Sequence, residues 1–353
     1  MLITTVDELR LHLPNHAYDD LESMAGAFRR SEADVLVEKV GTALYREMLK
    51  HYSQIDDAER RDWLVQEGQF DGQDNPWAEL TYLCQQVIVF DAFCRNADIN
   101  AISVNQSGIN VVDADNYDAA SKDGIAAYKK QLNKEMHAAV NRLLIFLEEC
   151  SVCCDATTSD NDEPEEEMLA PQQEIVTLWK SSKFYYKHTH LFVATATQFQ
   201  EYVDIYDSRE RFVSLLPDIR FCQRQYIVNE LGIPLASDLL AKKITGTGND
   251  AEQETIRMAQ EALCLCVETR SKMFNRPEAK DEAFGSVTRM VDYVFWNIES
   301  FDTDVAKHFP KYNEAIAAAN ARKNASTTDC QGRAPKWENN QRGNHLFVTP
   351  VIF

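Results

Sequence analysis

Glycine and proline are scarce in this chain of 353 residues, which contains 12 Gly and 10 Pro. Together they make up about 6% of the residues, against about 12% in average proteins. Sandwiches and barrels need many tight turns, so this shortage disfavours turn-rich β folds. The composition is 44% hydrophobic and 10% aromatic, which is enough for packed cores and excludes a wholly disordered chain. The sequence therefore predicts a mainly α fold.

Long apolar runs and positive charge are also lacking. The longest unbroken apolar run, Ala262 to Val267, falls far short of the roughly 20 residues that a membrane span needs. The start of the sequence has no basic segment followed by an apolar one, so no signal peptide is expected. Acidic residues outnumber basic ones by 56 to 36, and the net charge of −20 argues against binding to nucleic acid phosphates or anionic membranes.

The nine cysteines are an odd number in a chain long enough to fold without disulfides. Cys84, Cys264 and Cys266 fall within helical patterns, where a free thiol behaves as a small hydrophobic group. We therefore expect free thiols and a cytoplasmic location.

The domain organisation follows from a change in composition. Residues 155–167 include the run SDNDEPEEE, which has almost no apolar side chain and is typical of a solvated linker. We predict a helical domain over residues 1–150, an acidic linker over 151–171, a second helical domain over 172–319 and a polar tail over 320–353. Small β elements are expected as an N-terminal strand at Leu2–Thr5, a hairpin in ISVNQSGINVV (102–112) and a C-terminal strand.

The two predicted domains contain an internal repeat. Leu21 to Leu49 aligns without a gap on Phe212 to Leu240, an offset of 191 residues that superposes Gly41 on Gly232. Upstream, an offset of 190 residues superposes Leu2–Ile3 on Phe192–Val193. Any two amphipathic helices match in part, but the same elements recurring in the same order favour duplication. The second copy has no counterpart of the hairpin.

Metal-binding patterns are weak. Cys150, Cys153 and Cys154 form a cluster, but no second Cys pair or His pair follows at zinc-finger spacing. His188 and His190 could complete a zinc site only if the fold brought them to the cysteines. Spare thiols at the end of a helix are the preferred interpretation.

No histidine falls in a catalytic pattern. His12 and His16 are four residues apart, but Pro14 between them breaks the helix that would align them. There is no HExxH motif and no Glu-x-x-His pair of the kind found in di-iron bundles.

Three further segments have a structural and a functional interpretation. Gly246-Thr-Gly248 lacks the third glycine and the preceding strand of a dinucleotide site, so a loop between helices is favoured. Asp160 to Glu167 lacks the spacing of a calcium loop and is interpreted as linker. The aromatic and basic stretch from Trp179 to His188 could stack on single-stranded nucleic acid, but its acidic surroundings favour packing against the second helical domain.

The order of elements in residues 1–150 resembles one protein family. A Gly41-Thr-Ala-Leu44-Tyr45 step is followed by the helix PWAELTYLCQQVIVFDAF, a hairpin with Ser107-Gly108 and a long closing helix. This order resembles the helical head–tail connector (neck adaptor) proteins of tailed bacteriophages, especially prophage-type versions in Bacteroidetes. The resemblance extends more faintly over 190–300, although the simplest adaptors are single units.

The resemblance implies a non-enzymatic virion or prophage protein in a ring between portal and tail. Its partners would be further copies of itself, the portal and tail-completion proteins, and its location the host cytoplasm during assembly and then the virion. An acidic lumen would make it a passive DNA conduit, without sequence-specific nucleic acid binding or membrane contact. No catalytic, cofactor-binding or metal-binding residue and no cofactor is predicted. The alternatives are a bacterial helical adaptor or scaffold without a phage role and, less favoured, a metal-dependent enzyme.

The C-terminal segment His345 to Phe353, HLFVTPVIF, is strongly apolar. Its first four residues repeat His190 to Val193, which suggests a similar strand environment. Pro350 cannot donate to a ladder, so an edge position is expected. We expect the segment to dock on a sheet edge of its own chain or of a neighbouring subunit.

Overall fold

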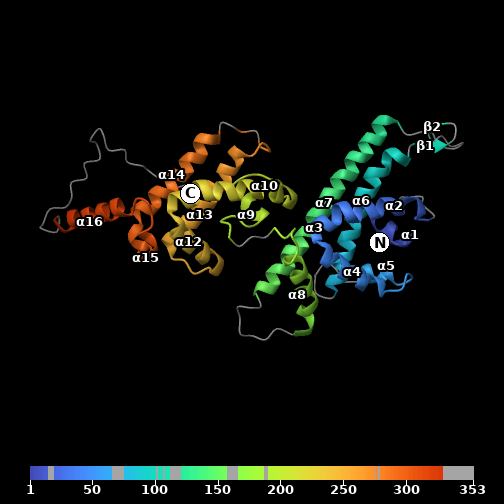
Figure 1. Cartoon of the computed structure of the whole chain (residues 1–353), viewed down its shortest axis with the longest axis horizontal. Coiled ribbons are helices and arrows are strands. Elements are labelled where there is room, and N and C mark those ends of the chain that lie inside the picture. The colour runs from blue at the N-terminus through green and yellow to red at the C-terminus, as the bar shows by residue number, and fades with distance from the viewer. Residues whose placement is uncertain are drawn as a thin grey trace, which may run out of the picture. The chain divides into compact units, whose positions relative to one another are not determined.

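The computed structural model describes residues 1–14, 20–65, 75–100, 102–105, 108–111, 121–156, 166–186, 190–274, 276 and 279–328. The chain forms two compact units, each with its own buried core. Unit 1 comprises residues 1–188, 195–197 and 205–214, and unit 2 comprises residues 189–194, 198–204 and 215–353. Both units are built mainly from helices (Figure 1), which confirms the mainly α prediction.

Unit 1 is organised around the long helices α6 (Pro76–Asn100) and α7 (Lys122–Ala156), which pack along each other (Figure 1). Buried side chains occur on most sides of α6, so this helix lies at the centre of the unit. The other helices of unit 1 are α1 (Val6–His12), α2 (Glu22–Ser31), the π-turn η1 (Glu32–Leu36), α3 (Val37–Val40), α4 (Thr42–Ser53), α5 (Arg60–Leu64) and α8 (Glu166–Lys180).

Between α6 and α7 lies a short antiparallel hairpin of β1 (Ile102–Asn105) and β2 (Gly108–Val111). Ile102 pairs with Val111 and Asn105 with Gly108. The two strands form a two-stranded sheet within the described part of the chain.

Unit 2 is organised around α13 (Asp250–Arg270) and α14 (Lys280–Trp296), which pack against each other. Asn249 caps α13 and forms a reciprocal capping box with Glu252. The chain passes between the units several times over residues 188–215, and α9 (Ala196–Gln200) and α10 (Arg209–Cys222) are each divided between them. The remaining helices are η3 (Gln223–Val228), α11 (Asn229–Leu231), α12 (Ile233–Thr245), η5 (Ile298–Ser300), α15 (Thr303–Ala306) and α16 (Tyr312–Thr328).

Both units contain the same helix interruption at the positions that the repeat superposes. In unit 1 a π-turn starts at Glu32 and the helix ends at Gly41, whose φ and ψ are 87° and 155°. In unit 2 a π-turn starts at Gln223 and the helix ends at Gly232, with φ and ψ of 84° and 146°. This backbone conformation is essentially restricted to glycine.

The predicted N-terminal strand is wrong. Leu2 and Ile3 are fully buried but belong to no strand, and Thr5 caps α1 as part of a capping box with Glu8. Apolar β-prone residues occur here because the segment is buried. Side chains, instead of a neighbouring strand, satisfy the backbone groups of Leu2.

The unit boundary also differs from the predicted domains. Helix α8 packs on α4, α6 and α7 of unit 1, so residues 172–180 lie in the first unit and not the second. The reason is an apolar face of Ile175, Val176 and Trp179, all buried. At the other end, α16 continues to Thr328, which makes the first part of the predicted polar tail helical. The predicted strand at 345–353 lies outside the described residues.

None of the helices in the described part of the chain combines the length and apolar character that a bilayer crossing needs.

Candidate functional site: paired polar clamps

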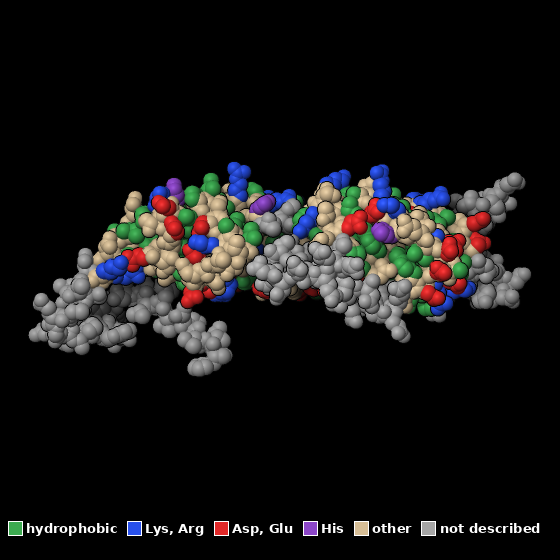
Figure 2. All heavy atoms as spheres, turned by 90° about the horizontal axis from the view of Figure 1, so that it is seen from below, with side chains coloured by type: hydrophobic (Ala, Val, Ile, Leu, Met, Phe, Trp, Pro, Cys, Tyr) green, Lys and Arg blue, Asp and Glu red, His purple; other side chains and the backbone are tan. Residues whose placement is uncertain are grey.

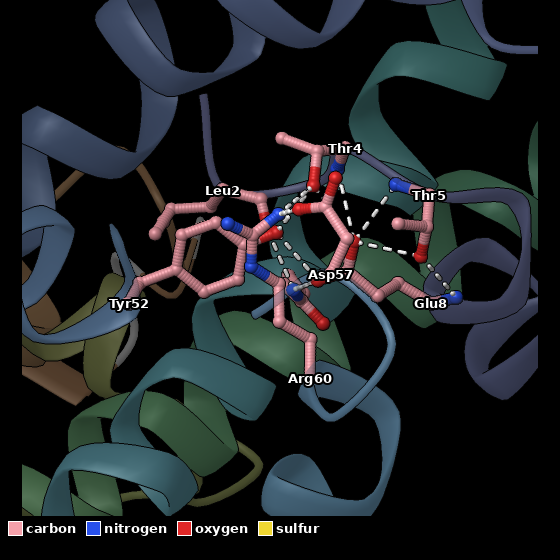
Figure 3. Close-up of polar contacts among 8 residues, drawn as sticks. Leu2, Thr4, Thr5, Glu8, Tyr52, Asp57 and Arg60 are labelled. Atoms are coloured by element: carbon pink, nitrogen blue, oxygen red, sulfur yellow. Dashed lines mark hydrogen bonds and ion pairs between the residues drawn. The ribbon is translucent and has the colours of Figure 1, made fainter. Parts of the chain in front are cut away.

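Four polar side chains, Glu8, Glu32, Tyr52 and Gln85, hold the extended segment at the start of unit 1, and we call them the unit 1 clamp. Glu8 is fully buried, and its Oε2 accepts the backbone N–H groups of Thr4 at 3.0 Å and Thr5 at 2.8 Å (Figure 3). Its Oε1 accepts the Tyr52 hydroxyl at 2.6 Å and the Gln85 amide at 3.0 Å. Each carboxylate oxygen therefore receives at least two donors, which offsets the cost of its burial.

The backbone of Leu2 is satisfied on both sides by this clamp. Its N–H donates to Glu32 Oε1 at 2.5 Å, and its carbonyl oxygen accepts Gln85 Nε2 at 2.6 Å. A neighbouring strand would supply the same donor and acceptor. The clamp thus replaces a sheet ladder with side chains from η1 and α6.

Arg60 is a cation beside Tyr52 in this cluster, and the Met1 ammonium lies 4.0 Å from Glu32 Oε2. The Arg60 guanidinium lies 4.5 Å from the centre of the Tyr52 ring, donates to Thr4 Oγ1 at 2.5 Å and pairs with Asp57 (Figure 3). Burial and the nearby Glu8 carboxylate raise the pKa of Tyr52. Tyr52 therefore remains a protonated donor to Glu8 at physiological pH.

Unit 2 has a corresponding clamp of Gln198, Gln223, Lys243 and Gln260. Three of these residues lie at the repeat positions of Glu8, Glu32 and Tyr52, with offsets of 190, 191 and 191 residues. Gln223 Oε1 accepts the Phe192 N–H at 2.8 Å, and Gln260 Nε2 donates to the Phe192 carbonyl at 2.9 Å. Phe192 is therefore held at both backbone groups, as Leu2 is in unit 1.

The segment after Phe192 is held in the same way. The backbone N–H of Ala194 donates to Gln198 Oε1 at 2.9 Å, and Thr4 donates equivalently to Glu8 in unit 1. Lys243 Nζ donates to the Leu191 carbonyl at 3.1 Å and approaches Gln198 Oε1 at 3.4 Å. The two clamps thus share their geometry.

The chemistry of the two clamps differs. Unit 1 uses the carboxylates of Glu8 and Glu32, whereas unit 2 uses the neutral amides of Gln198 and Gln223. The acid–phenol pair of Glu8 and Tyr52 corresponds to the amide–amine pair of Gln198 and Lys243 in unit 2. Burial lowers the pKa of Lys243 to about 8. Each pair therefore contains one readily charged group, but of opposite sign.

His12 belongs to the surroundings of the unit 1 clamp. It ends α1, in agreement with the break predicted at Pro14, and it is buried against the Tyr82 ring at 4.9 Å. Its Nε2 donates to Gln85 Oε1 at 3.2 Å, because the Gln85 amide nitrogen is already used as a donor. Burial lowers the pKa of His12 to about 4. His16 lies outside the described residues.

The proposed cysteine cluster is placed only in part. Cys150 is buried on α7, and Cys153 and Cys154 follow on the same helix, with side chains outside the described residues. His188 also lies outside them, whereas His190 is exposed in unit 2. Across the ranges that the structure describes, no three His, Cys, Asp or Glu side chains gather as metal ligands would.

The glycine-rich and acidic segments are structural where they are described. Gly246 ends α12 in a left-handed conformation, and Gly248 precedes the cap of α13, so this segment is a loop between helices as the sequence favours. Glu166 and Glu167 begin α8, while 160–165 lie outside the described residues.

The aromatic and basic stretch packs into unit 1, not against the second helical domain as predicted. Trp179 is fully buried and meets the edges of Tyr185 and Tyr186, with centroid distances of 4.9 and 5.5 Å. Tyr186 is buried too, so two of these rings are unavailable for stacking on bases.

On the face in Figure 2, Lys and Arg side chains are scattered among Asp and Glu in the described parts of both units.

One buried polar cluster of unit 1 was not predicted. Glu148 accepts the Tyr186 hydroxyl at 2.8 Å and Arg209 Nε at 3.2 Å, and Asn141 accepts the Arg209 backbone N–H at 3.0 Å. Burial, followed by the Glu148 charge, raises the pKa of Tyr186. The available signal was an acid at position 148 on the apolar stripe of Leu144 and Leu147, where a charge needs a partner.

Residues 37–152 match a family described as "Family of unknown function (DUF6712)". The match covers about a third of the chain and lies within unit 1, from α3 to near the end of α7. No curated protein and no solved structure matches this chain.

Proposed function

We propose that this chain is a non-enzymatic structural protein of a tailed phage or prophage, a head–tail connector that forms part of a ring between portal and tail. The observation that carries the proposal is the recurrence of one clamped helical arrangement in both units. We infer that one module was duplicated and that both copies retain the interactions that hold its entry segment. Buried polar clamps that hold backbone suit a protein that presents surfaces rather than one that turns over substrate.

The charge of the chain supports a passive role toward DNA. A net charge of −20 repels the phosphate backbone, so DNA passing through a ring of such subunits would not be gripped. In this proposal the partners are further copies of the chain, portal protein and tail-completion protein. The protein would reside in the host cytoplasm during assembly and then in the virion.

The alternatives come from other classes. A bacterial helical adaptor or scaffold would use the same two units without phage partners. A metal-dependent enzyme would need Cys150, Cys153 and Cys154 or scattered carboxylates to form a site through residues that the structure does not describe.

Mass measurement and electron microscopy of the purified full-length chain, alone and with a portal protein encoded beside it, test the proposal. We expect closed rings, alone or on the portal, no stoichiometric zinc or iron, and no retention on DNA at low salt. A monomer that does not bind the portal protein would contradict the connector proposal and favour the bacterial adaptor. Stoichiometric metal would favour the enzyme.

A further inference from the structure

An uncharged apolar stripe is exposed along α12 of unit 2. It consists of Ile233, Ser237, Leu240, Ala241 and Ile244, spaced so that all five share one face of the helix. Ile233 is 71% exposed and Ile244 is 57% exposed, and apolar side chains that are exposed together on one surface mark interaction sites more often than single ones do. We call these five residues the α12 stripe.

Unit 1 provides the control for this surface. The repeat superposes the α12 stripe on Thr42, Arg46, Leu49, Lys50 and Ser53 of α4. Exposure is the same at each pair of positions: the Leu is half-buried and the other four residues are exposed in both units. The fold therefore does not require apolar residues here, and the α12 stripe is a property of unit 2 alone.

The surroundings of the stripe specify an uncharged occupant. No member of the stripe carries charge, and the adjacent Asp238 and Lys242 form an ion pair with each other at 2.7 Å. On α4, by contrast, Arg46 and Lys50 fall within the equivalent stripe. A charged partner would gain nothing from the α12 stripe, whereas an apolar peptide would bury both isoleucines.

We propose that the α12 stripe binds the C-terminal segment of this same chain, residues 345–353. That segment, HLFVTPVIF, has six large apolar side chains and no acidic residue, lysine or arginine. The sheet edge expected as its acceptor is not offered by unit 2, where the described residues contain no strand. A helical face also tolerates Pro350, because docking on it requires no ladder of backbone donors.

The connecting chain is long enough for this arrangement within one molecule. Helix α12 contacts α15, and α16 begins six residues after α15 ends. The 17 residues of α16 extend about 25 Å from that point. Residues 329–344 then span up to about 50 Å when extended, so the segment can return to α12. This inference does not depend on the connector proposal.

Photo-crosslinking of the full-length protein tests the proposal. Ile244 is replaced by p-benzoylphenylalanine in one variant, and Ser53, its counterpart on α4, is replaced in a matched control. Equal amounts of ¹⁵N-labelled and unlabelled protein are mixed, irradiated and mapped by mass spectrometry. We expect position 244 to crosslink to residues 345–353 in peptides of a single isotopic composition, and position 53 to give no such product.

Three results would overturn the proposal. Mixed-isotope products with 345–353 would mean that a neighbouring copy supplies the segment. Mixed-isotope products with α12 would mean that two α12 stripes pair. Absence of products with 345–353, while circular dichroism shows an intact fold, would mean that the segment does not bind the stripe. Hydrogen exchange provides a second readout, because Ile233→Ser with Ile244→Ser should abolish any protection of 345–353, while Thr42→Ala with Ser53→Ala should not.

Discussion

Both units use side chains to satisfy the backbone groups of an extended segment, but these side chains differ in charge. In unit 1 the clamp is built on Glu8 and Glu32, and in unit 2 on Gln198 and Gln223. Glutamate and glutamine have the same shape, so an oxygen reaches the same backbone N–H in both units. The difference teaches that the position of the acceptor is fixed by the fold, whereas its charge is free to vary when the neighbouring side chain varies with it.

The largest expected effect separates the two superposed glycines. A Cβ at Gly232 would clash with the His308 carbonyl oxygen, and a Cβ at Gly41 would clash with both the hydroxyl oxygen and the Cβ of Ser182. Both glycines have a positive φ, but the clash at Gly232 is with backbone, whereas the clash at Gly41 is with a side chain whose Oγ can rotate and whose Cβ moves only with its own backbone. We expect Gly232→Ala to lower the free energy of unfolding by about 3 kcal/mol or more and Gly41→Ala by about 1–3 kcal/mol.

Urea denaturation, with hydrogen exchange to report each unit separately, measures these losses. Adding Ser182→Gly to Gly41→Ala should recover part of the loss, since it removes the side chain in contact. Equal losses in both units would show that the strained backbone conformation alone, and not the contact with His308, determines the size of the loss.

The second effect comes from exchanging the clamp residues. Gln223→Glu should lower the free energy of unfolding by about 2–3 kcal/mol. Gln223 Nε2 donates to the His190 carbonyl oxygen at 2.8 Å, and a carboxylate oxygen in its place would face that carbonyl oxygen without a proton. Glu32→Gln should cost less, about 1–2 kcal/mol, because the amide oxygen still accepts the Leu2 N–H while the amide nitrogen faces the Met1 ammonium. Chemical denaturation at pH 7 compares the two variants, and the reverse order would break the proposed equivalence of the clamps.

A further effect, of similar size, is a pH dependence between pH 4 and 6.5 that arises from His12 in unit 1. The pKa of His12 is about 4 in the folded chain and near 6.5 when unfolded, so the unfolded chain binds the additional proton between these values. Stability contributed by His12 is present above pH 6.5 and falls by about 3 kcal/mol as the pH drops through 6.5 toward 4. The equivalent position in unit 2 is Tyr202, which does not titrate in this range.

The comparison of wild type with His12→Phe isolates this contribution. Burial raises the pKa of Glu79 to about 7, which changes stability in the opposite direction between pH 4.5 and 7, but Glu79 is present in both proteins and cancels in the difference. A pH-independent difference between the two unfolding free energies would show that His12 titrates normally in the folded chain.

The smallest expected effect is the coupling between the charge of the residue at position 8 and the side chain at position 52. Glu8→Gln should lose about 1–2 kcal/mol, because an amide nitrogen then faces donors on one side of the clamp. Adding Tyr52→Lys recreates the Gln198–Lys243 pair of unit 2 and should recover about 1 kcal/mol. A double-mutant cycle by denaturation measures this coupling, and simple additivity would show that the two positions are independent.

The sequence predicts the elements governed by local patterns. The end of the first helix before Pro14 and the superposition of Gly41 on Gly232 both follow from proline and glycine chemistry. The N-terminal strand was predicted wrongly because buried extended residues have the same composition whether a strand or side chains satisfy them. Helix α8 was assigned to the wrong domain because the acidic run before it suggests a boundary, although its own apolar face decides where it packs.

The clamps were not predicted because their partners are distant in sequence. Glu8 resembles an ordinary acid in the first turn of a helix, and its contacts with Tyr52 and Gln85 span 44 and 77 residues. The repeat contained the usable signal, since Glu8 and Glu32 superpose on Gln198 and Gln223. A conservative exchange of acid for amide at two linked positions indicates shared geometry more strongly than matched hydrophobic residues do.

Residue-resolved hydrogen exchange at the backbone amides of Thr4 and Ala194 tests the central claim most directly. These amides donate to Glu8 and Gln198, the equivalent acceptors of the two clamps. If the units are two copies of one clamped module, both amides should exchange far more slowly than in an unstructured peptide, and Glu8→Ala and Gln198→Ala should each release only the amide in its own unit. Exchange of either amide at the unstructured rate in the unaltered protein would contradict the account.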